Sequence, residues 1–337
     1  MNTKRWIALV SAAVLLFFSL GLNTIMAVFT TDFFSSFESA FDVTESVAYE
    51  TPIENGDMDN RIALVSVEGT ILDVGSGSWW EEVQYNHQGF MAQLDSILND
   101  DTVKGVVLEV NSPGGGVIES AEIHEKLVQI KEQREIPIYV SMGTYAASGG
   151  YYIAAPANKI FAQKETITGS IGVIMQAINY EELAEKVGIK FETIKSGQHK
   201  DMLGGSRAST EEEKAMLQEI IDESYEDFVD VIEQGRGMTE AEVKAVADGR
   251  ILGGTQAVRA GLVDDIGKLD DTIAALRADY GLEDAQLFEY TTTNDSLGSL
   301  LGVKVSSLFG PSQEEQLMQK ILSTSNSPRM MYLYGEY

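Results

Sequence analysis

The chain has 337 residues, 44% of them hydrophobic, with 24 basic and 52 acidic side chains and a formal net charge of −28. This composition excludes a wholly disordered chain, and the excess of acidic groups argues against nucleic-acid binding, which needs clustered Lys and Arg. There is no cysteine and there are only three histidines, none at metal-ligand spacing. Disulfides, thiolate catalysis and thiolate-rich metal sites are therefore excluded, and we expect no metal.

The first predicted element is a membrane anchor over residues 1–29. Residues 6–29 carry no charged side chain, and as a helix they would span about 36 Å, enough for a hydrocarbon core of about 30 Å. Lys4 and Arg5 precede this stretch and the next basic residue is Arg61, so the positive-inside rule puts the N-terminus in the cytoplasm and the rest outside. A cleaved signal peptide is the alternative, but its apolar core is shorter and ends at a small-residue site.

Residues 30–60 are acidic and lack clear periodicity, so we interpret them as a stalk that partly packs on the domain. From residue 61 to 290, short apolar runs alternate with helical patterns, which predicts an α/β domain with a parallel sheet and crossover helices. The predicted strands are residues 62–67, 105–110, 137–141, 159–162, 171–175 and 191–194. The predicted helices are residues 89–98, 118–131, a small-residue helix from about 148, 180–187 and 210–234. Residues 210–234 carry an apolar stripe that we expect to face the core: Met216, Ile220, Tyr225, Phe228 and Ile232.

Residues 291–337 form a C-terminal tail with a short predicted helix at 313–321 and the ending MMYLYGEY. Exposed, that apolar ending would promote aggregation, so we expect it to dock. Packing on the core, a contact between subunits and occupation of the protein's own cleft all remain open.

Ser148 is the first candidate catalytic residue. It lies in the sequence AASGG (146–150), after a predicted strand and at the start of a helix. Small neighbours allow a nucleophile on a tight strand-to-helix turn, where the amide of the following glycine can stabilise an oxyanion. Alone this motif is a weak signal, because packing of a small-residue helix is the more common explanation for such a sequence.

A second motif, NSPGGG at residues 111–116, follows the predicted strand 105–110 directly. Glycines at the carboxyl end of a parallel strand allow close backbone approach and present amide donors. They could form an oxyanion hole together with a ledge that pairs with an extended peptide. A phosphate cradle is a poorer interpretation, because no GK[ST] follows and the net charge opposes it, and an ordinary glycine turn remains open.

The base that would activate Ser148 is not selected by composition. We expect His87 and His124 to be surface histidines, and a lysine can act as a base where desolvation disfavours its charged form. Lys200, in SGQHKD (196–201), is one candidate among 24 basic residues.

Taken together, five motifs resemble the signal peptide peptidase A family. They are the strand 105–110 with NSPGG, TYAASGGYY around Ser148, TGSIGV at 168–173, SGQHKD at 196–201 and GRILGGTQAVRAGLVDDIG at 249–267. The resemblance covers roughly residues 60–270 and the anchor, and it implies the short, single-domain bacterial type with a Clp/crotonase-like fold. GRILGGTQA departs mildly from the aromatic-containing version common in relatives, which affects no catalytic residue.

The resemblance implies a serine endopeptidase with a Ser/Lys dyad formed by Ser148 and Lys200. Ser170 matches the serine that positions the lysine, Gly114 and Gly149 match the oxyanion hole, and Gly115 and Gly116 would bind substrate as an added strand. A histidine triad as in Clp relatives does not fit, because no histidine lies between Ser148 and His199.

The family implies no cofactor, extracytoplasmic substrates such as remnant signal peptides and other unfolded apolar peptides, and ring- or dome-like homo-oligomers in which neighbours complete each other's sites. Two alternatives are a non-catalytic scaffold that binds peptides or membrane proteins in the same cleft, and an acyl-CoA enzyme on a crotonase-like fold. The expected extracytoplasmic placement disfavours the second.

Overall fold

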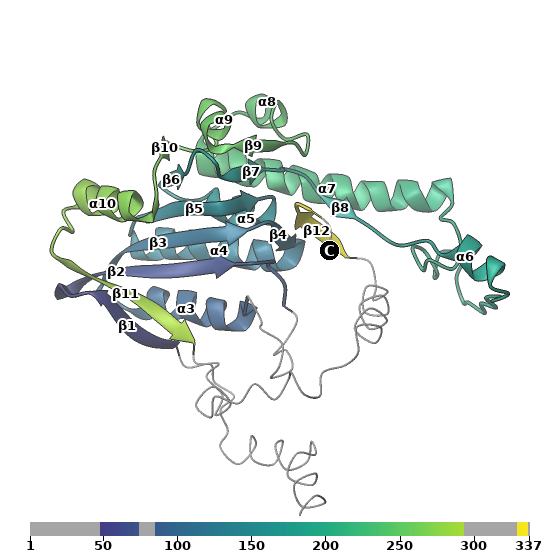
Figure 1. The fold of residues 1–337 in the computed structure, drawn as a ribbon, viewed down its shortest axis with the longest axis horizontal. Coiled ribbons are helices and arrows are strands. Elements are labelled where there is room, and N and C mark those ends of the chain that lie inside the picture. The colour runs from purple at the N-terminus through teal and green to yellow at the C-terminus, as the bar shows by residue number, and fades with distance from the viewer. Residues whose placement is uncertain (1–47, 74–84, 293–328, 336–337) are drawn as a thin grey trace, which may run out of the picture. The chain divides into compact units, whose positions relative to one another are not determined.

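The computed structural model describes residues 48–73, 85–292 and 329–335, all within one compact unit. Their main sheet has nine strands in this described part, in the order β1-β11-β2-β3-β5-β6-β10, with β7 beside β5 and β9 beside β7 (Figure 1). The bounds are β1 Ala48–Glu54, β2 Asp57–Glu68, β3 Val103–Ser112, β5 Ile138–Ala147, β6 Lys159–Ala162, β7 Ile167–Gly169, β9 Ile251–Gly253, β10 Asp265–Ile266 and β11 Ala285–Thr292. A second, three-stranded sheet contains β4 Gly114–Gly116, β12 Met330–Leu333 and β8 Ile174–Met175.

The predicted parallel sheet with crossover helices is confirmed. Strands β11, β2, β3, β5, β6 and β10 are parallel to one another, and β7 is parallel to β5. In the main sheet only the pairs β1–β11 and β7–β9 are antiparallel. The helices are α3 His87–Asn99, α4 Val117–Arg134, α5 Gly149–Ala154, α6 Glu181–Lys186, α7 Glu211–Arg236, α8 Glu240–Lys244, α9 Gly254–Arg259 and α10 Leu269–Tyr280.

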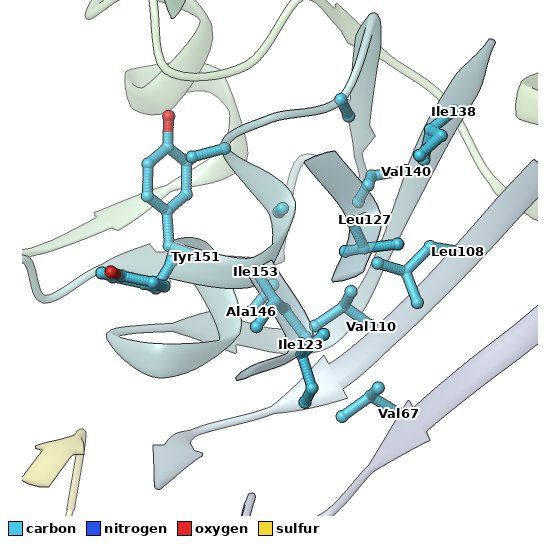
Figure 2. Packing of buried hydrophobic residues seen from close by; sticks show 14 of the residues in the cluster. Val67, Leu108, Val110, Ile123, Leu127, Ile138, Val140, Ala146, Tyr151 and Ile153 are labelled. Atoms are coloured by element: carbon cyan, nitrogen blue, oxygen red, sulfur yellow. The ribbon is translucent and has the colours of Figure 1, made fainter. Parts of the chain in front are cut away.

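Side chains alternate between the two faces of the sheet along the central strands, so the core has two layers. In β3, Val106, Leu108 and Val110 point to the face covered by α3, α4 and α5, while Val107 points to the face covered by α10. Figure 2 shows Leu108 and Val110 of the sheet facing Ile123 and Leu127 of α4. Because both faces are covered, the central strands are continuously apolar, and this pattern makes them recognisable in the sequence.

The sheet begins earlier than predicted. Residues 48–60, interpreted as part of a stalk, form β1 and the start of β2. One acidic side chain of β1 is paired in the fold, because Arg61 Nη1 lies 2.5 Å from Glu50 Oε2. The Arg61 guanidinium also lies 4.3 Å from the Phe288 ring centroid. The remainder of the predicted stalk and the predicted anchor lie outside the described residues.

Three other predictions are corrected. Residues 191–194 form no strand, and only Ile174–Met175 of the predicted strand 171–175 is extended. Ile194 is 97% exposed, and none of the described strands pairs with this β-favouring segment. In α7, Phe228 and Ile232 face the core as expected, but Met216 and Ile220 are exposed because the N-terminal half of the helix extends beyond the sheet (Figure 1).

The long helix α7 has well-defined ends. Thr210 and Glu213 form a capping box at its start, and Gly237 ends it with φ 63°. Among the described residues, no helix is both long and apolar enough to cross a membrane.

Candidate active site

Ser148 lies on the sharp turn between β5 and α5. Its backbone has φ 54° and ψ −118°, a left-handed conformation that is strained for a residue with a side chain. The Ser148 N–H donates to the Gly169 carbonyl at 2.8 Å, and this bond ties the turn to β7. The turn is therefore held by its neighbours in a shape that the residue would not adopt freely.

The glycine strand β4 lies beside this turn because β3 and β5 are parallel neighbours and both end here. Ser112 of β3 is in register with Ala146 of β5. One edge of β4 is already paired, since Gly116 N–H donates to Ile71 O and Ile71 N–H donates to Gly114 O, at 2.8 and 2.9 Å. Successive backbone groups of a strand point to alternate sides, so the N–H and C=O of Gly115 face the opposite edge.

That opposite edge of β4 is occupied by the chain's own C-terminal strand. Strand β12 lies antiparallel between β4 and β8, with Tyr332 opposite Gly115 and Met331 opposite both Gly116 and Ile174. Tyr334 N–H donates to Pro113 O at 2.8 Å. The described ending of the tail, residues 330–333, thus lies between β4 and β8 of its own chain.

The carbonyl oxygen of Tyr332 lies beside the Ser148 turn. A Cβ built on Gly149 would be 3.1 Å from this oxygen, and one built on Gly114 would collide with it. The same Gly114 Cβ would lie 2.6 Å from the Gly149 amide nitrogen. The two glycines and the peptide carbonyl are thus packed together. A side chain at Gly114 would displace the bound strand, and one at Gly149 would first meet Ser120 Oγ, 2.6 Å from its Cβ.

The backbone bonds distinguish Gly115 from Gly114. The Gly114 N–H donates to Ser112 Oγ at 3.1 Å. In an antiparallel ladder hydrogen-bonded pairs recur at every second residue, so the bond between Tyr334 and Pro113 places Tyr332 and Gly115 in such a pair. The Gly115 amide therefore faces the Tyr332 carbonyl, and the Gly114 amide, which the resemblance places in the oxyanion hole, faces Ser112 Oγ.

An aromatic pocket holds the Tyr332 side chain, which is 1% exposed. Its ring is stacked on Tyr152 of α5, with centroids 4.9 Å apart, and lies 4.7 Å from Phe228 of α7. Its hydroxyl donates to the Ser224 carbonyl at 2.9 Å. The sequence analysis assigned Phe228 to the core and did not single out Tyr152. The two tyrosines that follow the glycines after Ser148 were the signal that could have indicated an aromatic pocket.

A backbone hydrogen bond holds the segment that carries Ser170 next to Ser148. Ser170 follows β7, whose Gly169 accepts the Ser148 N–H, and its own N–H donates to Arg250 O at 2.8 Å. Ser170 also has a positive φ, 50°, and is 9% exposed. The structure thus brings together five of the expected residues: Ser148, Gly149, Gly114, Gly115 and Ser170.

Lys200 lies elsewhere in the same chain. It is exposed, in a loop next to the start of α7, where the neighbouring His199 Nδ1 is 3.5 Å from Glu213 Oε1. The Ser148 region contacts α7 at Phe228, 15 residues further on, which is about 22 Å along a helix. In Figure 1, α6 and this loop lie beyond the N-terminal end of α7, away from α5.

Both histidines expected at the surface are at least partly buried. His87 is 3% exposed, with Nδ1 2.8 Å from the Tyr85 hydroxyl and Nε2 2.7 Å from Glu122 Oε2. His124 packs edge-on against Tyr152 at 5.3 Å, and burial lowers its pKa to about 4. The expectation fails because both side chains lie on helix faces turned toward the core.

A nucleophile on a strained turn, beside a glycine strand that holds an extended peptide, is the geometry of a serine peptidase. Comparison with known proteins agrees: residues 130–283 match the model of peptidase family S49. A candidate signal peptide peptidase SppA of Enterococcus faecium is 42% identical over 348 residues, covering 99% of both chains. Protease 4 of Haemophilus influenzae is 31% identical over 302 residues, 84% of this chain and 48% of that protein.

A further relative, a candidate protease of Methanocaldococcus jannaschii, is 40% identical over 197 residues, 58% of this chain and 63% of that protein. The chain therefore belongs to peptidase family S49, the signal peptide peptidase A family. Its mainly parallel α/β sheet fits the Clp/crotonase-like fold expected from the sequence.

Proposed function

We propose that the protein is a membrane-anchored serine endopeptidase that cleaves remnant signal peptides and other unfolded apolar peptides on the extracytoplasmic side. The observation that carries this proposal is the placement of β12, an extended peptide that pairs with β4 and has one carbonyl beside Ser148. A substrate strand bound in the same way would present its scissile carbonyl at the position of Tyr332 O.

Ser148 is the proposed nucleophile, and the amides of Gly149 and Gly115 are the proposed oxyanion donors. Gly115 is preferred to Gly114 because its N–H faces the bound carbonyl, whereas the Gly114 N–H is directed to Ser112 Oγ. Each such donor typically contributes about 3 kcal/mol to transition-state stabilisation. Gly116 continues the substrate ledge.

Lys200 is the proposed base, and a neighbouring subunit supplies it. The position of Lys200 near the start of α7, about 22 Å along the helix from the part that contacts α5, supports this proposal. Neutral Lys200 of one subunit would take the Ser148 proton of the next and return it to the leaving amine. Ser170, beside Ser148, would hold the incoming lysine.

The surface around Lys200 supports assembly. Large apolar side chains are exposed there, on the segment from residue 178 to the loop after α6 and on the first turns of α7. They are Ile178, Leu183, Val187, Ile189, Phe191, Ile194, Met216 and Ile220. Such a concentration of exposed apolar groups is typical of a protein interface, so we propose that a second copy of this chain covers it.

The direct test is hydrolysis of a quenched fluorescent apolar peptide by the wild type and by Ser148→Ala and Lys200→Ala. We expect activity only in the wild type, with all three proteins folded and equally assembled by light scattering. Wild-type inactivity in the intact assembly would support the alternative of a peptide-binding scaffold, while activity surviving Lys200→Ala would require another base.

A further inference from the structure

The groove has an acidic group at the end where the bound strand enters. Strand β12 runs antiparallel to β4, so the residues before Met331 pass beyond Gly116 toward the first turn of α4. Glu119 lies in that turn, and its side chain is only 11% exposed. Arg329 is the described residue that reaches it, with Nη1 3.6 Å from Glu119 Oε1.

Glu119 is held in place by the protein itself. Its Oε1 accepts the Asp73 N–H at 3.2 Å, and its Oε2 lies so close to Gly116 that a Cβ there would collide with it. The absence of a side chain at Gly116 therefore leaves the carboxylate at the edge of the groove. A carboxylate in the first turn of a helix is also favoured by the helix dipole, which explains its charge but not its contact with the bound strand.

The surroundings reinforce the negative potential. The carboxylates of Glu119, Asp73 and Glu122 all act on the Tyr85 hydroxyl and, after burial, are the next causes of its raised pKa. Largely buried carboxylates gain more from a cation than solvated ones do, because water screens them less. A basic side chain on the bound strand is the complement of this site.

We propose that Glu119 is a specificity-determining residue that selects substrates with Arg or Lys three positions before the residue whose carbonyl is attacked. Arg329 occupies that position relative to Tyr332. This inference rests on the proposed peptidase function, since it assigns a further binding position in the same groove. Substrates would therefore combine a basic residue with the apolar and aromatic residues that follow it.

The test uses three quenched fluorescent peptides built on the tail sequence RMMYLY, with Arg, Gln or Glu at the first position. We expect the full-length wild type to show about threefold to tenfold higher kcat/KM for the Arg peptide than for the Gln peptide, and the lowest for the Glu peptide. Glu119→Gln should bring the Arg-to-Gln ratio close to one, because glutamine keeps the hydrogen bond to Asp73 N–H but not the charge. Glu125→Gln, an exposed position on the same helix, should keep the wild-type ratio.

Binding of the same peptides to full-length Ser148→Ala, measured by fluorescence anisotropy, separates this inference from the peptidase proposal. The protein's own tail competes equally with every peptide, so the ratio of affinities is preserved. An Arg preference in binding that Glu119→Gln removes supports the inference even if no peptide is hydrolysed. An equal ratio in the wild type and Glu119→Gln, in hydrolysis or in binding, overturns it.

Discussion

The conformation of Ser148 stores strain at the site where chemistry is proposed. Its φ of 54° and ψ of −118° are natural for glycine and costly for other residues. We expect Ser148→Gly to be more stable than Ser148→Ala by about 1 kcal/mol, because both lack the hydroxyl and only glycine relieves the strain. Thermal unfolding of the two variants measures the difference, and an equal or higher midpoint for Ser148→Ala would contradict it.

His124 makes the fold sensitive to acid. Burial against Tyr152 lowers its pKa to about 4, while an unfolded histidine has its ordinary value near 6.5. Between these pH values the histidine is protonated in the unfolded state but not in the folded state. The free energy of unfolding therefore falls as the pH falls from about 6.5 to 4. The expected loss between pH 7 and pH 5 is about 2 kcal/mol.

Denaturation of the wild type and His124→Phe at pH 7 and pH 5 isolates this contribution. The variant keeps an aromatic ring beside Tyr152 but cannot be protonated, so its stability should depend less on pH by the same amount. An equal pH dependence in both proteins would show that His124 is not the responsible group.

At this scale the sequence predicted that the Ser148 motif and the glycine motif meet. It did not predict how their backbones are oriented, or that Lys200 lies away from them within one chain. Ser148, Gly149 and the residues 114–116 are recognisable because small residues follow two neighbouring strands. The choice between Gly114 and Gly115 depends on which amide faces the bound strand, and that is set by the pairing of β4 with Ile71. No residue type distinguishes the two.

Among the elements, the loop that carries Lys200 is fixed by ion pairs to α7. Arg207 donates to Asp201 at 2.5 Å and to Glu213 at 2.6 Å. The bonds from Arg207 lower the pKa of Glu213 to about 2. Glu213 therefore stays ionised in mild acid, and its contribution to stability is lost only as the pH falls through its unfolded and then its folded pKa.

Arg207→Ala should release this loop while leaving the sheet intact. We expect kcat to fall by about tenfold or more with little change in KM, since the lysine is misplaced but the groove is not. Hydrogen exchange should rise in residues 195–207. Lys214→Ala, which removes only an exposed pair with Glu211, is the matched control. A rise in KM alone, or no change in exchange, would contradict this role for Arg207.

The strands were predicted correctly where they lie in the centre of the sheet, with both faces buried. The prediction failed where a segment has no neighbouring strand, or where its neighbour is distant in the sequence. The apolar runs of β2, β3 and β5 are unmistakable because both faces are buried. Residues 191–194 have the same local character but no strand beside them, and β4 is made of three glycines whose extended form depends on β12 and Ile71. The local sequence does not indicate which distant segments will lie beside these residues.

Considered as a whole, the molecule has its proposed substrate groove filled by its own strand β12. A tethered occupant acts at an effective concentration in about the millimolar range, so it competes with substrates in solution. Deletion of residues 329–337 should lower KM for an apolar peptide by about tenfold at unchanged kcat. Deletion of residues 336–337 alone leaves β12 intact and should change neither KM nor kcat. An unchanged KM in the longer deletion would show that the strand does not compete with substrate.

The central claim is that Ser148 of one subunit works with Lys200 of another. The most direct measurement is co-expression of Ser148→Ala and Lys200→Ala chains, each inactive alone, followed by hydrolysis of the apolar peptide. In a ring of heterologous contacts, random mixing should restore about a quarter of wild-type activity, because only one neighbour pairing in four supplies both groups. Ser148→Ala co-expressed with the double variant should stay inactive. Mixed assemblies without activity, beside an active wild type, would contradict the account.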